Sequence, residues 1–119
     1  MKSFKDFPKI YICVDHIDFR KSIDGLCGVV QEEMKMSVFT EALFVFCSKR
    51  KDRLKVLYWD RTGFALWYKR LEEEKFKWPK NVENQGVLHI STSDFELFLS
   101  GIDLWKIKKH RELKYDDAS

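Results

Sequence analysis

Apolar and polar residues recur with two different periods along the chain, and each period predicts a type of element. The run IYICV, residues 10–14, is rich in β-branched and aromatic residues and predicts a first strand. Apolar residues then recur at helical spacing over residues 19–34, which predicts a helix with Asp18 as its N-cap. The run ALFVFC, residues 42–47, is apolar at every position, so we expect a central strand covered on both faces.

The stretch LKVLYWDRTGFALWYKRL, residues 54–71, predicts a β-hairpin. Its DRTG segment matches a type I turn with Gly63 at the left-handed position, and a glycine bulge there would place Trp59 opposite Ala65 and Val56 opposite Tyr68. Strand alternation then separates two faces. The expected core face carries Leu54, Val56, Tyr58, Leu66 and Tyr68. The other, mixed face carries Lys55, Leu57, Trp59, Ala65, Trp67 and Lys69.

The remaining pattern completes an α+β fold. VLHIS predicts a last strand, and Thr92 or Ser93 is the expected N-cap of a final apolar helix that ends near Gly101. We therefore expect a mostly antiparallel sheet of four to five strands packed with two main helices, in the order strand, helix, three or four strands, helix. Residues 1–105 form the expected single domain. Residues 106–119 are a charged C-terminal tail, expected to be a loose arm or a helical extension ordered by a partner.

Composition narrows the possible classes of protein but does not indicate a function. A chain of 119 residues with 45% hydrophobic and 15% aromatic content is long enough for one domain with a substantial core. Its 22 Lys and Arg against 19 Asp and Glu give a formal charge of +3, which is mild for a nucleic-acid coat protein. No apolar run approaches the roughly 20 residues that cross a bilayer, and MKSFKDFPK lacks a signal-peptide pattern. We expect a cytoplasmic protein that does not bind membranes.

Sites for catalysis, metals and cofactors are not indicated. Cys13, Cys27 and Cys47 lie in apolar stretches without CxxC spacing, which favours reduced core thiols. The three histidines are isolated, so we expect no metal ligation, and phosphate-binding loops and hydrolase motifs are absent, so we expect no cofactor. The sequence favours a protein that is not an enzyme. Four aspartates could hold a nuclease metal, but cap, turn and surface roles explain them better: Asp15, Asp18, Asp24 and Asp60.

Basic residues gather in two segments that the hairpin brings together. They lie at the end away from the DRTG turn and are candidates for binding DNA phosphates: Lys49, Arg50, Lys51, Arg53, Lys55, Lys69 and Arg70, with Lys75 and Lys77 following. Trp59, Trp67 or Trp78 could stack on bases beside them. In the alternative interpretation, the tryptophans fill the core and the lysines rim it.

The first predicted helix carries a second candidate surface. Gly25 and Gly28 fall opposite its apolar face, where they would form a flat patch for a partner backbone, with Arg20 and Lys21 available for anionic groups. In the alternative interpretation, Asp24 and Gly25 form a turn and the helix starts later.

Several motifs identify a family. DFRKSIDGL (18–26), ALFVF (42–46), KRKDRLKVLYWDRTGFALWYKRLE (49–72) and FKWP (76–79) resemble the TnpB accessory family of insertion sequence 66 type elements, the product of the second open reading frame. The resemblance covers about residues 10–102 and implies a role in transposition beside a separate DDE transposase, without established catalytic activity. The chain has Glu73 and Glu74 where the family usually has a turn glycine, and Cys47 where it usually has a polar or basic residue.

Three hypotheses follow. The first is a non-enzymatic accessory that binds element DNA, or the transposase on that DNA, through the basic residues. The second is a protein-only adaptor that contacts the transposase or the element's other accessory protein through the outer face of the first helix. The third is a nuclease built on the aspartates. The sequence leaves the oligomeric state open.

Overall fold

The computed structural model describes residues 4–79 and 86–106. The elements follow the predicted order, with a short 3₁₀ turn in front and a π-helical continuation of the first helix: η1 (Phe4–Asp6), β1 (Lys9–Cys13), α1 (Ile23–Gly28), η2 (Val29–Glu33), β2 (Ala42–Cys47), β3 (Arg53–Asp60), β4 (Gly63–Arg70), β5 (Val87–Ile90) and α2 (Thr92–Leu99). The α+β prediction is confirmed. Apart from Lys106, the predicted tail lies outside the described residues, and with it His110, one of the three histidines.

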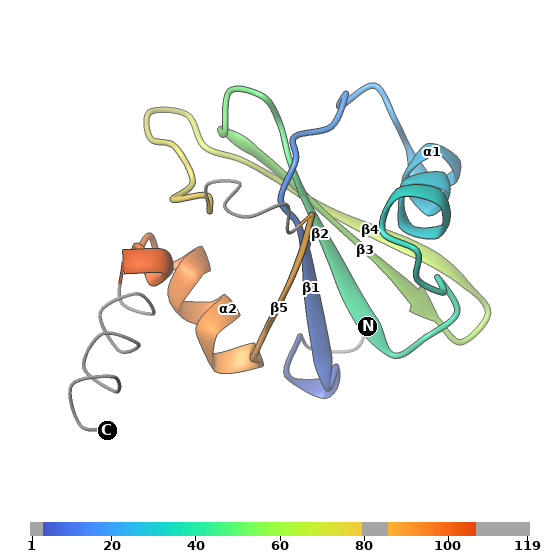
Figure 1. The fold of residues 1–119 in the computed structure, drawn as a ribbon. Helices are drawn as coiled ribbons and strands as arrows, with labels where there is room; N and C mark the ends of the chain where they lie inside the picture. The colour runs from blue at the N-terminus through green and yellow to red at the C-terminus, as the bar shows by residue number, and fades with distance from the viewer. Residues whose placement is uncertain (1–3, 80–85, 107–119) are drawn as a thin grey trace.

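The five strands form one sheet in the order β4-β3-β2-β1-β5. β1 pairs with β2 in parallel because α1 forms the crossover between them, and the other neighbours are antiparallel. β2 is the middle strand and all six of its residues are buried, which confirms the prediction from its unbroken apolar run. Figure 1 shows α1 and α2 on opposite sides of this sheet.

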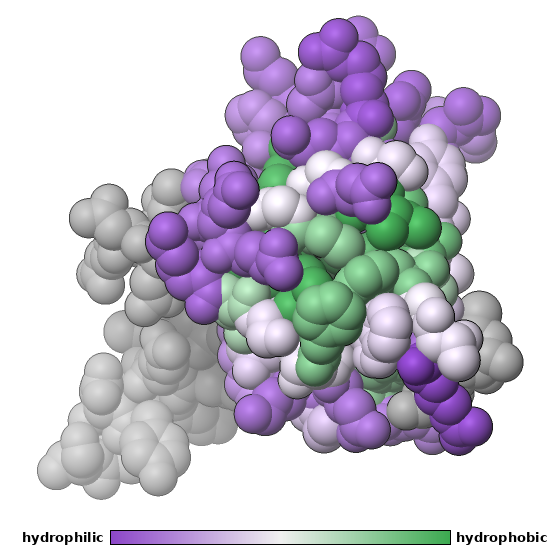
Figure 2. Space-filling model, turned by 90° about the vertical axis from the view of Figure 1, so that its right-hand side faces the viewer, coloured by the Kyte–Doolittle hydropathy of each residue, from purple (hydrophilic) through white to green (hydrophobic). Residues whose placement is uncertain are grey.

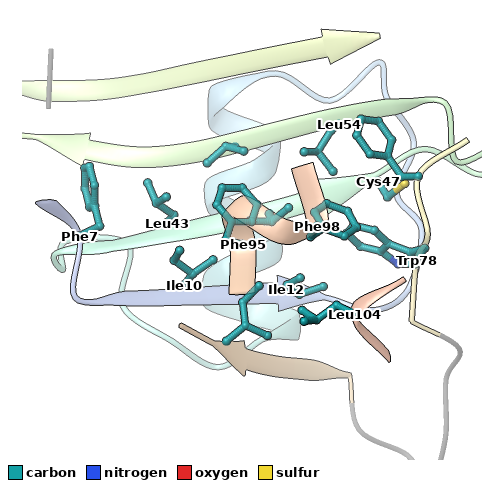
Figure 3. Packing of buried hydrophobic residues seen from close by; sticks show 14 of the residues in the cluster. Phe7, Ile10, Ile12, Leu43, Cys47, Leu54, Trp78, Phe95, Phe98 and Leu104 are labelled. Atoms are coloured by element: carbon teal, nitrogen blue, oxygen red, sulfur yellow. The ribbon is translucent and has the colours of Figure 1, made fainter. Parts of the chain in front are cut away.

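The α2 side of the sheet holds the larger core. Phe95 and Phe98 of α2 stack with ring centroids 6.2 Å apart, and they pack on apolar side chains of β1, β2 and β3. Figure 3 shows Ile10, Ile12 and Leu43 beneath these rings. Trp78 joins this cluster and is 7% exposed, so the prediction of a core tryptophan is confirmed at that position.

The α1 side holds a second core. Leu26, Val29 and Val30 are buried against Phe44 and Phe46 of β2, so the apolar face read from the sequence does cover the sheet. The cover is incomplete toward the hairpin, where Phe39 is 62% exposed. Figure 2, which looks onto this side, shows an apolar patch bordered by hydrophilic residues.

The predicted start of the first helix is wrong. The helix begins at Ile23 with Ser22 at the N-cap position, and the Asp18 carboxylate instead accepts hydrogen bonds from the backbone N–H and guanidinium of Arg20. This local turn satisfies Asp18 five residues before the first residue of the helix. The later start proposed as an alternative is confirmed, but Asp24 and Gly25 lie within the helix rather than in a turn. In α2 the N-cap is Ser91, whose hydroxyl accepts the Asp94 N–H at 3.1 Å, not Thr92 or Ser93.

The predicted hairpin register is wrong by one residue. The loop consists of Arg61 and Thr62 alone, with Asp60 opposite Gly63, because Arg61 adopts the positive φ of 51° that a tight two-residue loop requires at its first position. Trp59 therefore faces Phe64 and Val56 faces Trp67. The face assigned to Leu54, Val56 and Tyr58 is confirmed, but on β4 the faces exchange. Ala65 and Trp67 pack on that core, whereas Leu66 and Tyr68 lie on the α1 side.

Candidate nucleic-acid interface

Three loops meet at the end of the sheet away from the hairpin turn. They are residues 14–22 after β1, residues 48–52 between β2 and β3, and residues 71–79 after β4. Backbone hydrogen bonds join them: Ile17 N–H donates to Cys47, Leu71 N–H to Asp52 at 2.7 Å, and Phe76 N–H to Lys51 at 2.7 Å. These loops lie in the upper part of Figure 1. The predicted gathering of the two basic segments at this end is confirmed.

The β2–β3 loop is held by Ser48, which is 8% exposed. Its hydroxyl accepts the Arg53 N–H at 3.2 Å and donates to a carboxylate oxygen of Asp52 at 3.1 Å. Lys51 takes a left-handed conformation, with φ of 64°, and donates its N–H to the Ser48 carbonyl. The loop thus has a fixed backbone from which the exposed side chains of Lys49 and Arg50 project.

Like charges face each other where β3 begins and β4 ends. Arg53 lies directly opposite Arg70, and both side chains are exposed. Like charges at directly opposed sheet positions are destabilising. Glu72 offsets the charge of Arg70, because its carboxylate accepts a 2.9 Å hydrogen bond from the Arg70 guanidinium. This contact raises the pKa of Arg70. Arg53 has no salt bridge of this kind among the ion pairs of the described residues.

A shallow depression of about 460 Å³ opens between the first two loops. The Asp18 carboxylate at its edge is neutralised by Arg20, whose hydrogen bonds lower the pKa of Asp18 to about 2. Asp52 is engaged by the Ser48 hydroxyl. The cationic side chains therefore set the charge of the depression, and its open shape suits a phosphate backbone. The depression is lined by His16, Ile17, Asp18, Phe19, Ser48, Lys49, Arg50, Asp52 and Arg53.

Lys55 lies inside the protein rather than on this surface. It is 9% exposed, and its ammonium donates to the carbonyls of Phe19 at 2.9 Å and Lys21 at 2.8 Å. The same ammonium lies 4.8 Å from the centre of the Phe19 ring, and burial lowers the pKa of Lys55. Its role in the structure is to fasten residues 19–21 onto β3.

None of the four tryptophans, all of which are described, stands free beside the basic residues. Trp78 is buried with its indole N–H donating to the Val14 carbonyl at 2.8 Å, and Trp67 packs edge-on against Phe4. Trp59 lies next to the turn. Tyr68, which is 48% exposed and two residues before Arg70 on the same strand face, is an available aromatic ring. The register error had placed Tyr68 in the core, which is why sequence reasoning missed it.

The two candidate glycines of α1 differ in the space around them. A Cβ at Gly25 would lie 3.1 Å from Cβ and Cγ of Lys21, so Gly25 is explained by packing against that side chain. A Cβ at Gly28 would meet no atom within 4 Å. Arg20 and Lys21 are exposed just before the helix. Because Asp18 and Phe19 line the depression, this patch and the basic loop are neighbours.

Metal binding and thiol chemistry have little support in the described residues. No group of three or more metal-ligating side chains occurs in that part of the chain, and Asp60 lies at the hairpin turn, remote from Asp18. The three thiols are free, and burial raises the pKa of Cys13 and Cys47 to about 12. No helix in residues 4–79 and 86–106 is long and apolar enough to span a membrane.

Comparison with known proteins places these features in a family. A family model described as IS66 Orf2 like protein matches residues 8–109. The chain is 35% identical over 101 residues to the uncharacterized protein y4jC of Sinorhizobium fredii strain NGR234, covering 85% of each chain. It is also 35% identical over 98 residues to y4hO of the same strain, covering 82% of this chain and 83% of that one. No solved structure matches the chain.

Proposed function

Because the chain belongs to the IS66 Orf2-like family, we propose that it is a non-catalytic accessory protein of transposition that binds the DNA of its element. The contacts are made by a basic surface that we define by five residues: Lys49, Arg50, Lys51, Arg53 and Arg70. Lys69, the sixth candidate, lies opposite Leu54 on the other face of β4 and is not part of this surface. The DDE transposase and the other accessory protein of the element are the expected protein partners on that DNA.

The opposed pair Arg53 and Arg70 carries this proposal. A sheet gains nothing from two cations at directly opposite positions, and a neutral pair there would cost less. Bound phosphates would remove the repulsion. The conformation of Lys51 also supports the proposal, because a left-handed backbone is uncommon for a residue other than glycine and such residues are often found at functional sites.

The surface is suited to positioning DNA rather than to reading its sequence. Its contacts are cationic side chains on a fixed loop and on two strand ends, which match phosphate oxygens. Tyr68 adds a ring that could contact a sugar or an unpaired base. Such a protein would hold element DNA in place for the transposase while leaving the strand chemistry to that enzyme.

Fluorescence anisotropy tests the proposal. Labelled terminal DNA of the element and scrambled DNA are titrated with the full chain across a salt series, and each lost phosphate contact should reduce the logarithmic salt slope by about one unit. The double variant Lys49→Ala/Arg50→Ala should therefore flatten the slope by about two units. Lys9→Ala/Lys106→Ala removes the same charge elsewhere and should leave the slope nearly unchanged. Equal slopes for the two double variants, or no binding at low salt, would exclude this surface.

A protein-only adaptor is the second candidate, and Gly28 favours it. This glycine lies at the end of α1 with open space where a side chain would be, although alanine would stabilise a helix there by about 1 kcal/mol. Gly28→Leu should abolish capture of the transposase if a partner backbone approaches this position, while Gly25→Ala reports on packing against Lys21. Transposase capture unaffected by Gly28→Leu would remove the adaptor hypothesis.

A further inference from the structure

The outermost strand β4 has an open edge. It pairs with β3 from Gly63 to Arg70 without interruption, and on its other side the described part of the chain supplies no strand. Asp60 opposite Gly63 closes the loop, and Leu71 N–H donates to Asp52. Hydrogen-bonded pairs alternate along an antiparallel ladder. Every second residue of β4, counted from Gly63, therefore bonds to β3, and the residues that alternate with them turn their backbone N–H and C=O groups toward the open edge. These residues are Phe64, Leu66, Tyr68 and Arg70.

This edge has few of the devices that prevent strands from pairing. It contains no proline and no bulge, and its cations stand only at the far end, at Lys69 and Arg70. Phe64 and Leu66 are half-buried and Tyr68 is 48% exposed. All three lie on the α1 side of the sheet, the side on which Figure 2 shows an apolar patch. An edge of this kind is a template for another strand.

We propose that β4 pairs antiparallel with β4 of a second copy of this chain, about a twofold axis at Trp67. In this register Leu66 of each copy forms a hydrogen-bonded pair with Tyr68 of the other. Phe64 pairs in the same way with Arg70. The two sheets become one continuous sheet, and every contact is made twice, as an isologous interface requires.

Charge complementarity identifies the occupant as a second copy. Arg61 is exposed at the hairpin turn, and the chain leaving β4 carries three exposed carboxylates, Glu72 to Glu74. Antiparallel pairing about Trp67 brings the hairpin turn of each copy, with Arg61, to the end of β4 of the other copy, where the carboxylates Glu72 to Glu74 follow. The same symmetry sets the two Arg70 residues at opposite ends of the interface, so the cations do not oppose each other. The edge is thus complementary to itself in charge as well as in hydrogen bonding.

The first test is the mass of the full chain in solution, measured by light scattering after size-exclusion chromatography over a dilution series. We expect twice the 14.3 kDa mass of one chain at high concentration. Tyr68→Pro removes an outward N–H without breaking a bond to β3, so it should give a monomer. Tyr68→Phe keeps that N–H and should remain dimeric. Circular dichroism shows whether the proline variant is folded.

A charge exchange tests the register even if the proline variant fails to fold. Arg61→Glu and Glu73→Arg each create two like-charge contacts in a homodimer, and each should weaken it about tenfold. An equal mixture of the two variants restores both attractive contacts and should form a heterodimer of wild-type affinity. A chain that is monomeric at every concentration would overturn the proposal, as would a dimer whose affinity neither charge variant alters. The readout requires no DNA, so it is independent of the proposed DNA binding.

Discussion

The ammonium of Lys55 is hydrogen-bonded to the backbone carbonyl of Phe19 at 2.9 Å and lies 4.8 Å from the centre of that residue's ring. The contact joins residues 36 positions apart in the chain. It fixes the loop that carries Asp18 and Phe19 beside the β2–β3 loop. The wall of the depression therefore depends on a lysine that does not itself reach solvent to any large extent.

Replacing Lys55 should destabilise the fold. Lys55→Met keeps most of the apolar stem but leaves the carbonyls of Phe19 and Lys21 without their donor, so we expect a loss of about 1–3 kcal/mol in the free energy of unfolding. Denaturant unfolding monitored by tryptophan fluorescence measures this loss. Lys49→Met on the exposed loop is the control, expected within about 0.5 kcal/mol of wild type. Equal stability of the two variants would show that the Lys55 contacts contribute little.

The carboxyl group of Asp18 should titrate at unusually low pH. Its hydrogen bonds from Arg20 lower its pKa from the ordinary 3.8 to about 2. Since the pKa of the folded state lies below that of the unfolded chain, the stabilising contribution is present above the ordinary value and is lost as pH falls through about 2. Carboxyl-carbon NMR of Asp18 should show the low midpoint, and Arg20→Gln should return it toward the ordinary value. Lys21→Gln, the control, should move it less.

Sequence patterns predicted most of the fold but not the geometry of the hairpin. The unbroken apolar run of residues 42–47 indicated the central strand, because a short run that is apolar at every position is typical of a strand buried on both faces. The register depended on whether Arg61 would take a positive φ, which propensity disfavours and the tight loop imposes. A one-residue shift then reversed the faces of β4 and hid Tyr68.

The basic residues of the candidate surface could be found from the sequence, but the burial of one of them, Lys55, could not. Lys49 and Arg50 of the β2–β3 loop and Arg53 at the start of β3 are exposed at the expected end of the sheet, because charged side chains are rarely buried. Lys55 occupies the same basic run, but its environment is set by Phe19 and Lys21, more than thirty residues away. Long-range contacts of this kind leave no local signal in the sequence.

The opposed arginines predict a conflict between stability and binding. Arg53→Thr removes a like charge facing Arg70 and introduces a residue with high β-propensity. Its thermal unfolding midpoint should therefore rise slightly, while the affinity for DNA falls and the salt slope decreases by about one unit. Lys9→Thr at the exposed start of β1 is the matched control and should leave the salt slope unchanged. A lower midpoint for Arg53→Thr would mean that Arg53 supports the fold.

The three thiols should differ in reactivity. Burial raises the pKa of Cys13 and Cys47 to about 12, so neither is expected to form the reactive thiolate at pH 8. Cys27 is half-buried, whereas Cys13 and Cys47 are buried, although burial raises the pKa of Cys27 as well. An aromatic disulfide reagent should therefore modify Cys27 first in the native protein, and the other two after unfolding. Cys27→Ser should abolish the early phase, and an early phase that survives this change would contradict the assignment.

The FKWP segment, residues 76–79, should anchor the loop that carries the basic surface. The indole N–H of Trp78 donates to the Val14 carbonyl at 2.8 Å, and Phe76 N–H donates to the carbonyl of Lys51 in the basic loop. Trp78→Phe retains an aromatic ring in the core but leaves a polar group without its partner, so we expect a loss of about 1–3 kcal/mol. Because the segment also holds Lys51, the loop should lose protection from hydrogen exchange at Lys51 and Arg53 before the central strand does.

A comparison of Trp78→Phe with Leu26→Ala separates the loss of loop anchoring from general destabilisation of the fold. Leu26→Ala creates a cavity in the core on the α1 side and should cost about 2–5 kcal/mol, yet it does not touch the FKWP segment. If Trp78 acts through the loop, Trp78→Phe should weaken DNA binding more than Leu26→Ala does, under conditions in which both variants are folded. A larger binding defect in Leu26→Ala would instead mean that overall stability, rather than the anchoring of the loop by Trp78, controls the basic surface.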